Sequence, residues 1–480
     1  MIKQKVQQET ITNIGVSIAI TIIGFLSTMY FAHTLGSETL GMYYIFLSVY
    51  GVLNLFCDSG FGGATIKRIS EGKEQGEYWT GAVLVRIIVY AIIVTTILIF
   101  KDYFNNLIGI DATNILIVTI ALSSFASFFS HVIIGLDHIR ISALAGLVNS
   151  AGRTLIQVSL VFFGWQFFGL IYGYIFGMIS AIAVVLYYSI RYDIRVKPKM
   201  CQYRHIRSLF SYAAFTFLNG VGGTIFEYAD VMIIGIFLLK GDAGIYGVIW
   251  SFSSISLFIS SAMVSTMFPK ISRWSTDGNW KEVETSFGMA LTYSLIIAVP
   301  ILFGGILLGG DLLYYAYGVS FAGGAFTLTI ILLMRVFQVS STLTMQYLQG
   351  IDHPDIVFRV ISFTATLNII LNWFLIQWHG IEGAAVATLV TTLLTLILGY
   401  RYLKKFIALK VDWKGIRAIV SASIIMVGVI YALMGIFVAD SVLEVLAEVG
   451  IGAIVYGVVL IGLNKNIRDE LWTLRRIKLI

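Results

Sequence analysis

Apolar runs long enough to cross a lipid bilayer recur along the whole of this 480-residue chain. A helix that spans the hydrocarbon core needs about 20 mostly apolar residues. Because lipid offers no hydrogen bonds, such runs have to satisfy their own backbone, which favours helices over open sheets. We therefore predict an all-α integral membrane protein with fourteen spans, at residues 11–35, 39–66, 80–100, 113–136, 141–163, 165–190, 209–238, 243–268, 284–309, 321–349, 355–377, 380–402, 415–437 and 443–463.

Composition excludes several other classes of protein. The chain is 58% hydrophobic and 12% charged, whereas soluble domains average about 25% charged residues. The two cysteines, Cys57 and Cys201, lie in an apolar run and in a basic segment, which makes a disulfide scaffold or a Cys/His metal site improbable. No phosphate-binding loop of the G-x-x-x-x-G-K-[ST] type occurs. We expect no metal, no cofactor and no enzymatic activity.

The basic residues predict the orientation of the chain. Of 32 Lys and Arg, 27 fall in segments that lie on the same side as both termini, and only Lys101 and Lys240 fall on the other. Basic residues concentrate on the cytoplasmic side of membrane proteins. We expect a multi-pass protein of the cytoplasmic membrane with both termini inside, and we attribute the net charge of +6 to this topology rather than to nucleic-acid binding.

Short motifs recur between the two halves of the chain. Leu35-Gly36-Ser37-Glu38-Thr39-Leu40-Gly41-Met42-Tyr43 follows the first span, and Leu239-Lys240-Gly241-Asp242-Ala243-Gly244-Ile245-Tyr246 follows the seventh. Parallel repeats of this kind build alternating-access transporters with the substrate site between the halves. We predict two six-helix lobes in pseudo-twofold arrangement, followed by two more helices: residues 1–190, a basic cytoplasmic linker 191–208, residues 209–402, and residues 403–480.

Three arginines lie inside predicted spans, where an ionised group costs at least about 2.5 kcal/mol. Asn149, Arg153 and Gln157 recur at i, i+4 and i+8 and share one helix face, while Arg335 is followed by Gln338 on another span. Arginine presents forked donors that suit phosphate oxygens. These side chains and Arg86 are the predicted substrate-binding residues. The alternative for Arg153 and Arg335 is an ion pair between helices. The alternative for Arg86 is that its side chain snorkels to the membrane interface.

Acidic side chains within the spans are the second set of candidates. Asp58 ends the second predicted span, and Glu227 and Asp230 share a face of the seventh. They could bind a coupling cation, H⁺ or Na⁺, or neutralise the arginines. The sequence leaves both roles open.

The whole pattern resembles a known family. Six plus six plus two spans, the turn from Leu35 to Tyr43, Asp58-Ser59-Gly60-Phe61-Gly62 and Gly380-Ile381-Glu382-Gly383-Ala384-Ala385 together resemble the polysaccharide-type flippases of the multidrug/oligosaccharidyl-lipid/polysaccharide exporter superfamily. The resemblance implies a two-lobed bundle that moves a polyprenyl diphosphate oligosaccharide outward by alternating access. It implies the lipid-linked oligosaccharide and membrane lipids as partners, and we expect a monomer.

Two other functions are weighed against a flippase. A cation-coupled multidrug antiporter of the same superfamily would use Glu227 and Asp230 as ligands, but such proteins usually have twelve helices. A membrane-embedded glycan ligase or polymerase would need a substantial outer loop, and the longest predicted here is about residues 310–322.

Overall fold

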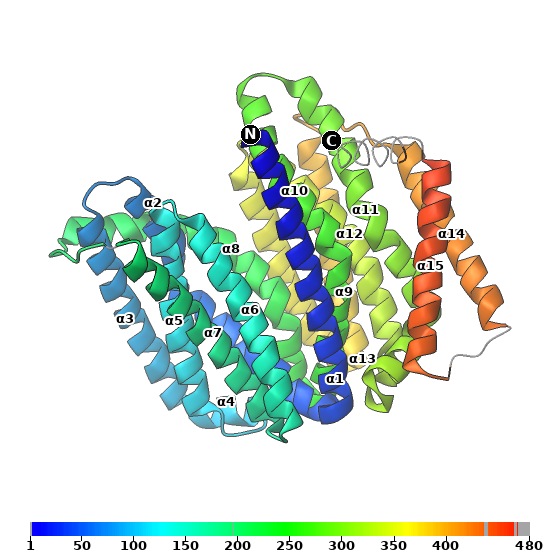
Figure 1. Cartoon of the computed structure of the whole chain (residues 1–480), viewed down its shortest axis with the longest axis horizontal. Coiled ribbons are helices and arrows are strands. Elements are labelled where there is room, and N and C mark those ends of the chain that lie inside the picture. Colours follow the sequence, from blue (N-terminus) through cyan, green and yellow to red (C-terminus); the bar gives the residue numbers. More distant parts are fainter. Residues whose placement is uncertain (1, 195, 436–439, 465–467, 469–480) are drawn as a thin grey trace. The chain divides into compact units, whose positions relative to one another are not determined.

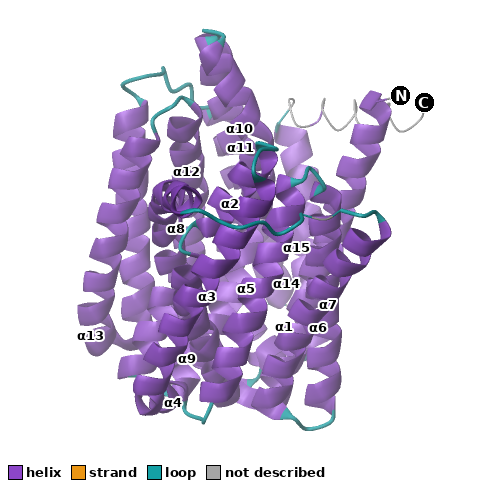
Figure 2. Cartoon of the chain, turned by 90° about the vertical axis from the view of Figure 1, so that its left-hand side faces the viewer, coloured by secondary structure: helices purple, strands orange, loops and turns teal. Residues whose placement is uncertain are grey.

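The computed structural model describes residues 2–194, 196–435, 440–464 and 468, with side chains from residue 23 onward apart from 215, 218 and 219. Its described residues are helical or in turns, and no strand is found among them (Figure 2). Within these described ranges, eleven helical segments are long and apolar enough to cross a membrane. The predicted all-α class is therefore confirmed. The exact count of fourteen spans stays a prediction.

The chain divides into two compact units, residues 1–247 and 248–480. Figure 1 labels their helices along the chain. The first unit contains α1 (Ile2–Asp58), α2 (Phe61–Ser70), α3 (Gln75–Ile99), α4 (Lys101–Ile108), α5 (Thr113–Gly135), α6 (Ile139–Phe162), α7 (Gln166–Arg191), α8 (Tyr203–Phe237) and the start of α9 (Lys240–Ser253).

The second unit continues from the end of α9. A 3₁₀ turn, η1, interrupts the predicted span 243–268 before α10 begins. The elements of this unit are η1 (Ser254–Leu257), α10 (Phe258–Thr276), α11 (Trp280–Asp311), the π-helical turn η2 (Leu312–Tyr317), η3 (Val319–Gly324), α12 (Ala325–Gly350), α13 (Pro354–Leu403), α14 (Trp413–Met434) and α15 (Val442–Leu463).

Two of the long helices contain a glycine with a non-helical backbone. Gly36 bends α1 (φ 73°, ψ 176°), and Gly380 bends α13 (φ 59°, ψ −140°). At 1.5 Å per residue, the 50-residue α13 would be about 75 Å long if straight, far more than one crossing of a core about 30 Å thick. Glycine adopts positive φ without steric cost, so each helix turns back at this residue.

One predicted boundary is wrong. The expected span 39–66 ends at Asp58, because Ser59 and Gly60 adopt positive φ angles of 42° and 75°. A Cβ on Gly60 would also lie 2.3 Å from the carbonyl oxygen of Ala213. Backbone conformation and close packing against α8 therefore both require glycine here, and the chain restarts as the short helix α2.

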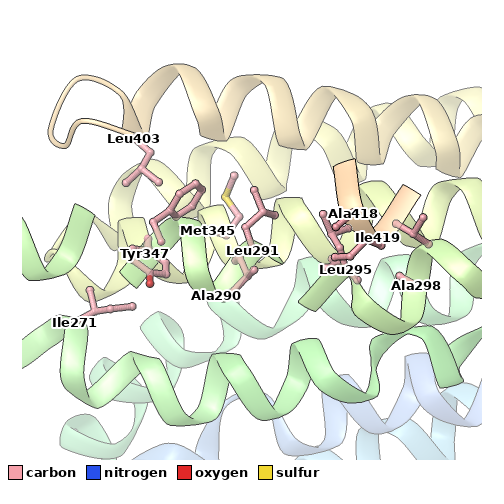
Figure 3. Close-up of a cluster of buried hydrophobic side chains, with 14 of the residues drawn as sticks. Ile271, Ala290, Leu291, Leu295, Ala298, Met345, Tyr347, Leu403, Ala418 and Ile419 are labelled. Atoms are coloured by element: carbon pink, nitrogen blue, oxygen red, sulfur yellow. The ribbon is translucent and has the colours of Figure 1, made fainter. Parts of the chain in front are cut away.

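Each unit has its own apolar core. In the first, Phe61 and Ile69 of α2 pack with Val85, Phe128 and Leu209 of three neighbouring helices. In the second, α11 and α12 supply much of the buried core, and Figure 3 shows Met345 and Tyr347 of α12 beside Leu291 of α11. The Tyr347 hydroxyl donates a hydrogen bond to Ser286 Oγ at 3.0 Å. A buried phenol is thus satisfied within an otherwise apolar cluster.

The two copies of the repeated glycine motif lie against each other in the first unit. A Cβ on Gly41 of α1 would lie 1.7 Å from the carbonyl oxygen of Lys240 and 3.1 Å from the amide nitrogen of Gly244. A Cβ on Gly244 would lie 1.9 Å from the carbonyl oxygen of Ser37. Both glycines are needed because backbone meets backbone with no room for a side chain.

Substitution of Gly41 tests this close approach. We expect Gly41→Ala to lower the free energy of unfolding by roughly 3 kcal/mol, the upper end for overpacking, because a backbone carbonyl cannot move aside. Thermal unfolding of the purified protein in detergent measures the change. Gly24→Ala in the same helix is the control, since nothing lies within 4 Å of its added Cβ. Equal stability of the two variants would contradict the packing described.

Candidate functional site

Asn149, Arg153 and Gln157 come together on one face of α6, toward α7 and α1. Two glycines of α7 allow this close packing: a Cβ on Gly177 would lie 2.4 Å from Asn149 Oδ1, and one on Gly173 would lie 2.3 Å from Gln157 Cγ. Gln157 donates from Nε2 to the Tyr43 hydroxyl at 3.1 Å and to the Leu170 carbonyl oxygen at 2.8 Å. The predicted polar stripe therefore faces the protein interior.

Arg153 is half-buried and lies over an aromatic ring. Its guanidinium carbon is 5.5 Å from the centre of the Tyr174 ring, within the range of a cation–π contact. Among the described residues it forms no ion pair with a carboxylate. An arginine held by an aromatic face keeps its N–H donors available for an anion.

Tyrosines surround this arginine, and the sequence reading did not single them out. Tyr174 packs edge-on against Tyr50, with ring centres 5.7 Å apart. The Tyr50 hydroxyl donates to Ser123 Oγ at 2.6 Å, and Ser123 in turn donates to Asn54 Oδ1 at 3.1 Å. The signal was present in the sequence: Tyr43, Tyr50 and Asn54 recur at helical spacing in the second predicted span.

Arg86 is paired with Asp58 inside the first unit. Arg86 is 5% exposed, and its Nη2 lies 2.9 Å from Asp58 Oδ1. Its Nη1 donates to the carbonyl oxygen of Ser124 and to Ser127 Oγ, while its guanidinium carbon lies 5.3 Å from the Phe128 ring centre. The pair holds α3, α1 and α5 together. Of the two roles left open for Asp58, this geometry favours neutralising an arginine.

The two acidic residues of α8 have different surroundings. Asp230 is buried and accepts a hydrogen bond from the Tyr246 hydroxyl. Glu227, one turn earlier, is exposed. Only Asp230 is therefore part of the interior of the first unit.

Arg335 lies in the second unit and is 2% exposed. It donates from Nε to Ser253 Oγ at 2.9 Å, from Nη1 to Gln338 Oε1 at 2.6 Å and from Nη2 to the Trp250 carbonyl oxygen at 3.2 Å. Its guanidinium carbon also lies 4.0 Å from the Trp250 ring centre. The structure thus brings the predicted Arg335 and Gln338 together. Through the bonds to Ser253 and Trp250, Arg335 joins α12 to the end of α9.

A ladder of buried amides and hydroxyls joins the two halves of α13 and was not predicted from the sequence. Asn372 Nδ2 donates to Asn368 Oδ1, and Asn368 Nδ2 donates to Thr388 Oγ1, both at 3.1 Å. Thr395 donates to Thr364 Oγ1 at 3.0 Å. These bonds hold the helix halves together on either side of the bend at Gly380. The sequence signal for this ladder is the spacing of four residues between Thr364, Asn368 and Asn372 in one predicted span and between Thr391 and Thr395 in the next.

Comparison with known proteins finds one matching family model and several relatives of this chain. A family model described as polysaccharide biosynthesis protein matches residues 6–275. A Haloferax volcanii protein described as "Probable low-salt glycan biosynthesis flippase Agl15" is 29% identical over 437 residues, which cover 90% of each chain. A second protein of that organism, described as "Probable flippase AglR", is 27% identical and covers 97% of this chain and 98% of its own length.

Solved structures with the same fold are also known. Lipid II flippase MurJ in an inward closed conformation matches with a TM-score of 0.78 at 20% identity, over 94% of this chain and 98% of that chain. An inward-facing multidrug resistance MATE family transporter of the MOP superfamily matches with a TM-score of 0.66 at 14% identity, over 81% and 96%. These similarities confirm the fold class that the resemblance implied.

Proposed function

Because this chain belongs to the polysaccharide biosynthesis protein family, we propose that it is a flippase that moves a lipid-linked oligosaccharide from the cytoplasmic to the outer leaflet. The observation that carries the proposal is the end-to-end similarity to the Haloferax volcanii protein described as a glycan biosynthesis flippase. Two relatives of this chain are described as probable flippases, and the chain is itself a multi-pass membrane protein.

The polar interior of the first unit supports an anionic cargo. A polyprenyl diphosphate sugar has a tail that can remain in lipid and a charged head that cannot cross it. Arg153, on the same helix face as Asn149 and Gln157, offers a permanent positive charge over the Tyr174 ring, which suits phosphate oxygens. Arg335 with Gln338 is proposed as a second anion-binding element, and Arg86 as a third that first has to separate from Asp58.

The direction of transport follows from the proposed orientation. With both termini in the cytoplasm, an inside-negative potential favours outward movement of the anionic head by about 2.3 kcal/mol per charge per 100 mV. Alternating access, action as a monomer, and coupling to H⁺ or Na⁺ through Asp58, Glu227 or Asp230 remain predictions from the sequence.

Transport by the purified protein in vesicles tests the proposal. The protein is reconstituted with a fluorescent polyprenyl diphosphate oligosaccharide, and outward movement is followed by the sugar's accessibility to an added oxidant. We expect movement that rises when an inside-negative potential is imposed. Efflux of a cationic dye without movement of the lipid-linked sugar would instead support the multidrug antiporter and overturn the flippase.

A further inference from the structure

An open pocket of about 560 Å³ lies at one end of the first unit, where the turn between α6 and α7 meets α1 and the turn that precedes α5. This is the end opposite the N-terminus of α1, lowermost in Figure 1. The volume falls within the roughly 300–1,000 Å³ of small-ligand sites. On the orientation proposed above, the pocket opens on the outer side of the membrane, where the glycan emerges.

Aromatic rings form one wall of the pocket. Phe163, Trp165, Phe168 and Tyr172 line it, and Phe163 and Trp165 are 72% and 51% exposed. The ring centres of Trp165 and Tyr172 are 5.8 Å apart, and Phe168 and Tyr172 stack at 6.1 Å with 26° between their planes. Trp165, Phe168 and Tyr172 therefore support one another along this wall of the pocket.

The polar groups of the pocket are neutral. Gln166 and Thr39 line it and carry an amide and a hydroxyl, each able to donate and to accept a hydrogen bond. No basic side chain is among the described residues that line the pocket. A diphosphate therefore finds no counter-charge among these lining side chains, in contrast to the surroundings of Arg153.

The turn that carries the pocket is held in one conformation. Gly164 and Gln166 both have positive φ, at 85° and 40°. The amide nitrogens of Gly164 and Trp165 donate back to the carbonyl oxygens of Val161 and Leu160 at 2.9 and 3.0 Å. A non-glycine residue in the left-handed region costs about 1–2 kcal/mol, so the surrounding contacts fix the direction in which Gln166 leaves the turn.

We propose that this pocket binds a neutral sugar residue of the lipid-linked glycan on the outer side. Pyranose rings present C–H groups on their faces and hydroxyls around their rims. Rings such as Trp165 and Tyr172 cover the faces, and an amide such as Gln166 bonds the rim. The proposal rests on the flippase function and adds a saccharide subsite separate from the arginines.

Lipid is the competing occupant. Trp and Tyr collect at membrane interfaces, where their rings lie among head groups without any specific ligand. A purely interfacial role needs only the aromatic rings, whereas this open pocket also contains an amide and a hydroxyl.

Saturation-transfer NMR on the protein in nanodiscs separates the two occupants. The probes are four neutral trisaccharides, of glucose, mannose, galactose and N-acetylglucosamine, added without any lipid carrier. The variants are Trp165→Ala, Tyr172→Ala and Gln166→Ala. Trp378→Ala is the matched control, because Trp378 is a 73% exposed tryptophan of α13 outside the pocket.

We expect at least one trisaccharide to receive saturation on its ring C–H protons with wild type and with Trp378→Ala. Binding should be roughly five- to tenfold weaker in Trp165→Ala and Tyr172→Ala, as expected for loss of one aromatic stacking partner. Gln166→Ala removes an exposed amide without touching the rings and should weaken binding two- to fivefold, which keeps the test valid if an aromatic variant fails to fold.

Two outcomes would overturn the subsite. One is a trisaccharide that binds all variants equally. The other is a protein that binds no trisaccharide while wild type and Trp165→Ala flip lipid-linked oligosaccharide at the same rate; there the flippase stands and the pocket is an interfacial belt. If the wild type does not flip the lipid-linked oligosaccharide but binds a trisaccharide that only the pocket variants lose, the proposed function is wrong. The saccharide site then still stands.

Discussion

Replacing Arg153 by alanine is expected to reduce transport of the lipid-linked oligosaccharide by roughly 100-fold while the protein remains folded. A hydrogen bond to a charged group contributes about 1.5–3 kcal/mol, and 1.4 kcal/mol corresponds to tenfold in rate or affinity. Arg153 is half-buried and rests on the Tyr174 ring rather than on a carboxylate. Its loss therefore leaves no opposite charge stranded in the interior. The reconstituted flippase assay measures the effect.

Matched variants distinguish a binding role from a general loss of charge. Arg153→Lys keeps the charge but loses the forked donors, and should retain an intermediate rate. Arg191→Ala removes an exposed arginine at the end of α7 and should transport as wild type does. Normal transport by Arg153→Ala would exclude this residue from the mechanism. Arg335→Ala is a poorer probe, because that side chain is buried and holds α12 to α9 through three hydrogen bonds.

Removing Asp58 is expected to lower the stability of the first unit by about 3 kcal/mol. Asp58→Ala leaves the charge of Arg86 buried without its carboxylate, and breaking a buried ion pair from one side costs about 3–5 kcal/mol. The lower end applies because the Asp58 side chain is 34% exposed and partly screened by solvent. Thermal unfolding in detergent measures the loss.

The double variant Arg86→Met/Asp58→Ala should be more stable than Asp58→Ala alone. An apolar side chain in place of a buried ion pair is often neutral or stabilising. If the double variant is as unstable as the sum of the two single changes, the residues do not interact as the structure indicates. If it also transports normally, Arg86 has a structural role and not a substrate-binding one.

The helical fold could be predicted from the sequence because apolar length alone decides it in a membrane. The polar stripe of Asn149, Arg153 and Gln157 also followed from helical period, and the structure places all three against α7. The break at Ser59 and Gly60 did not follow, since it depends on the approach of α8, which is distant in sequence.

The hydrogen-bond and ion-pair partners of the buried side chains could not be predicted from the sequence. Hydropathy marks Arg86 and Arg335 as buried charges, but the ion pair of one and the neutral acceptors of the other depend on which helices meet. Tyrosine counts as apolar in such a reading. Hydropathy therefore does not reveal the row of side-chain contacts from Tyr174 through Tyr50 to Ser123.

The contact between Gly41 and Gly244 is reciprocal. Both glycines occupy the same place in their copies of the motif, so the surface around one fits the surface around the other. Self-matching surfaces are those through which identical subunits form twofold dimers. The two motif copies therefore meet as the two sides of an isologous dimer interface do, although both belong to one chain.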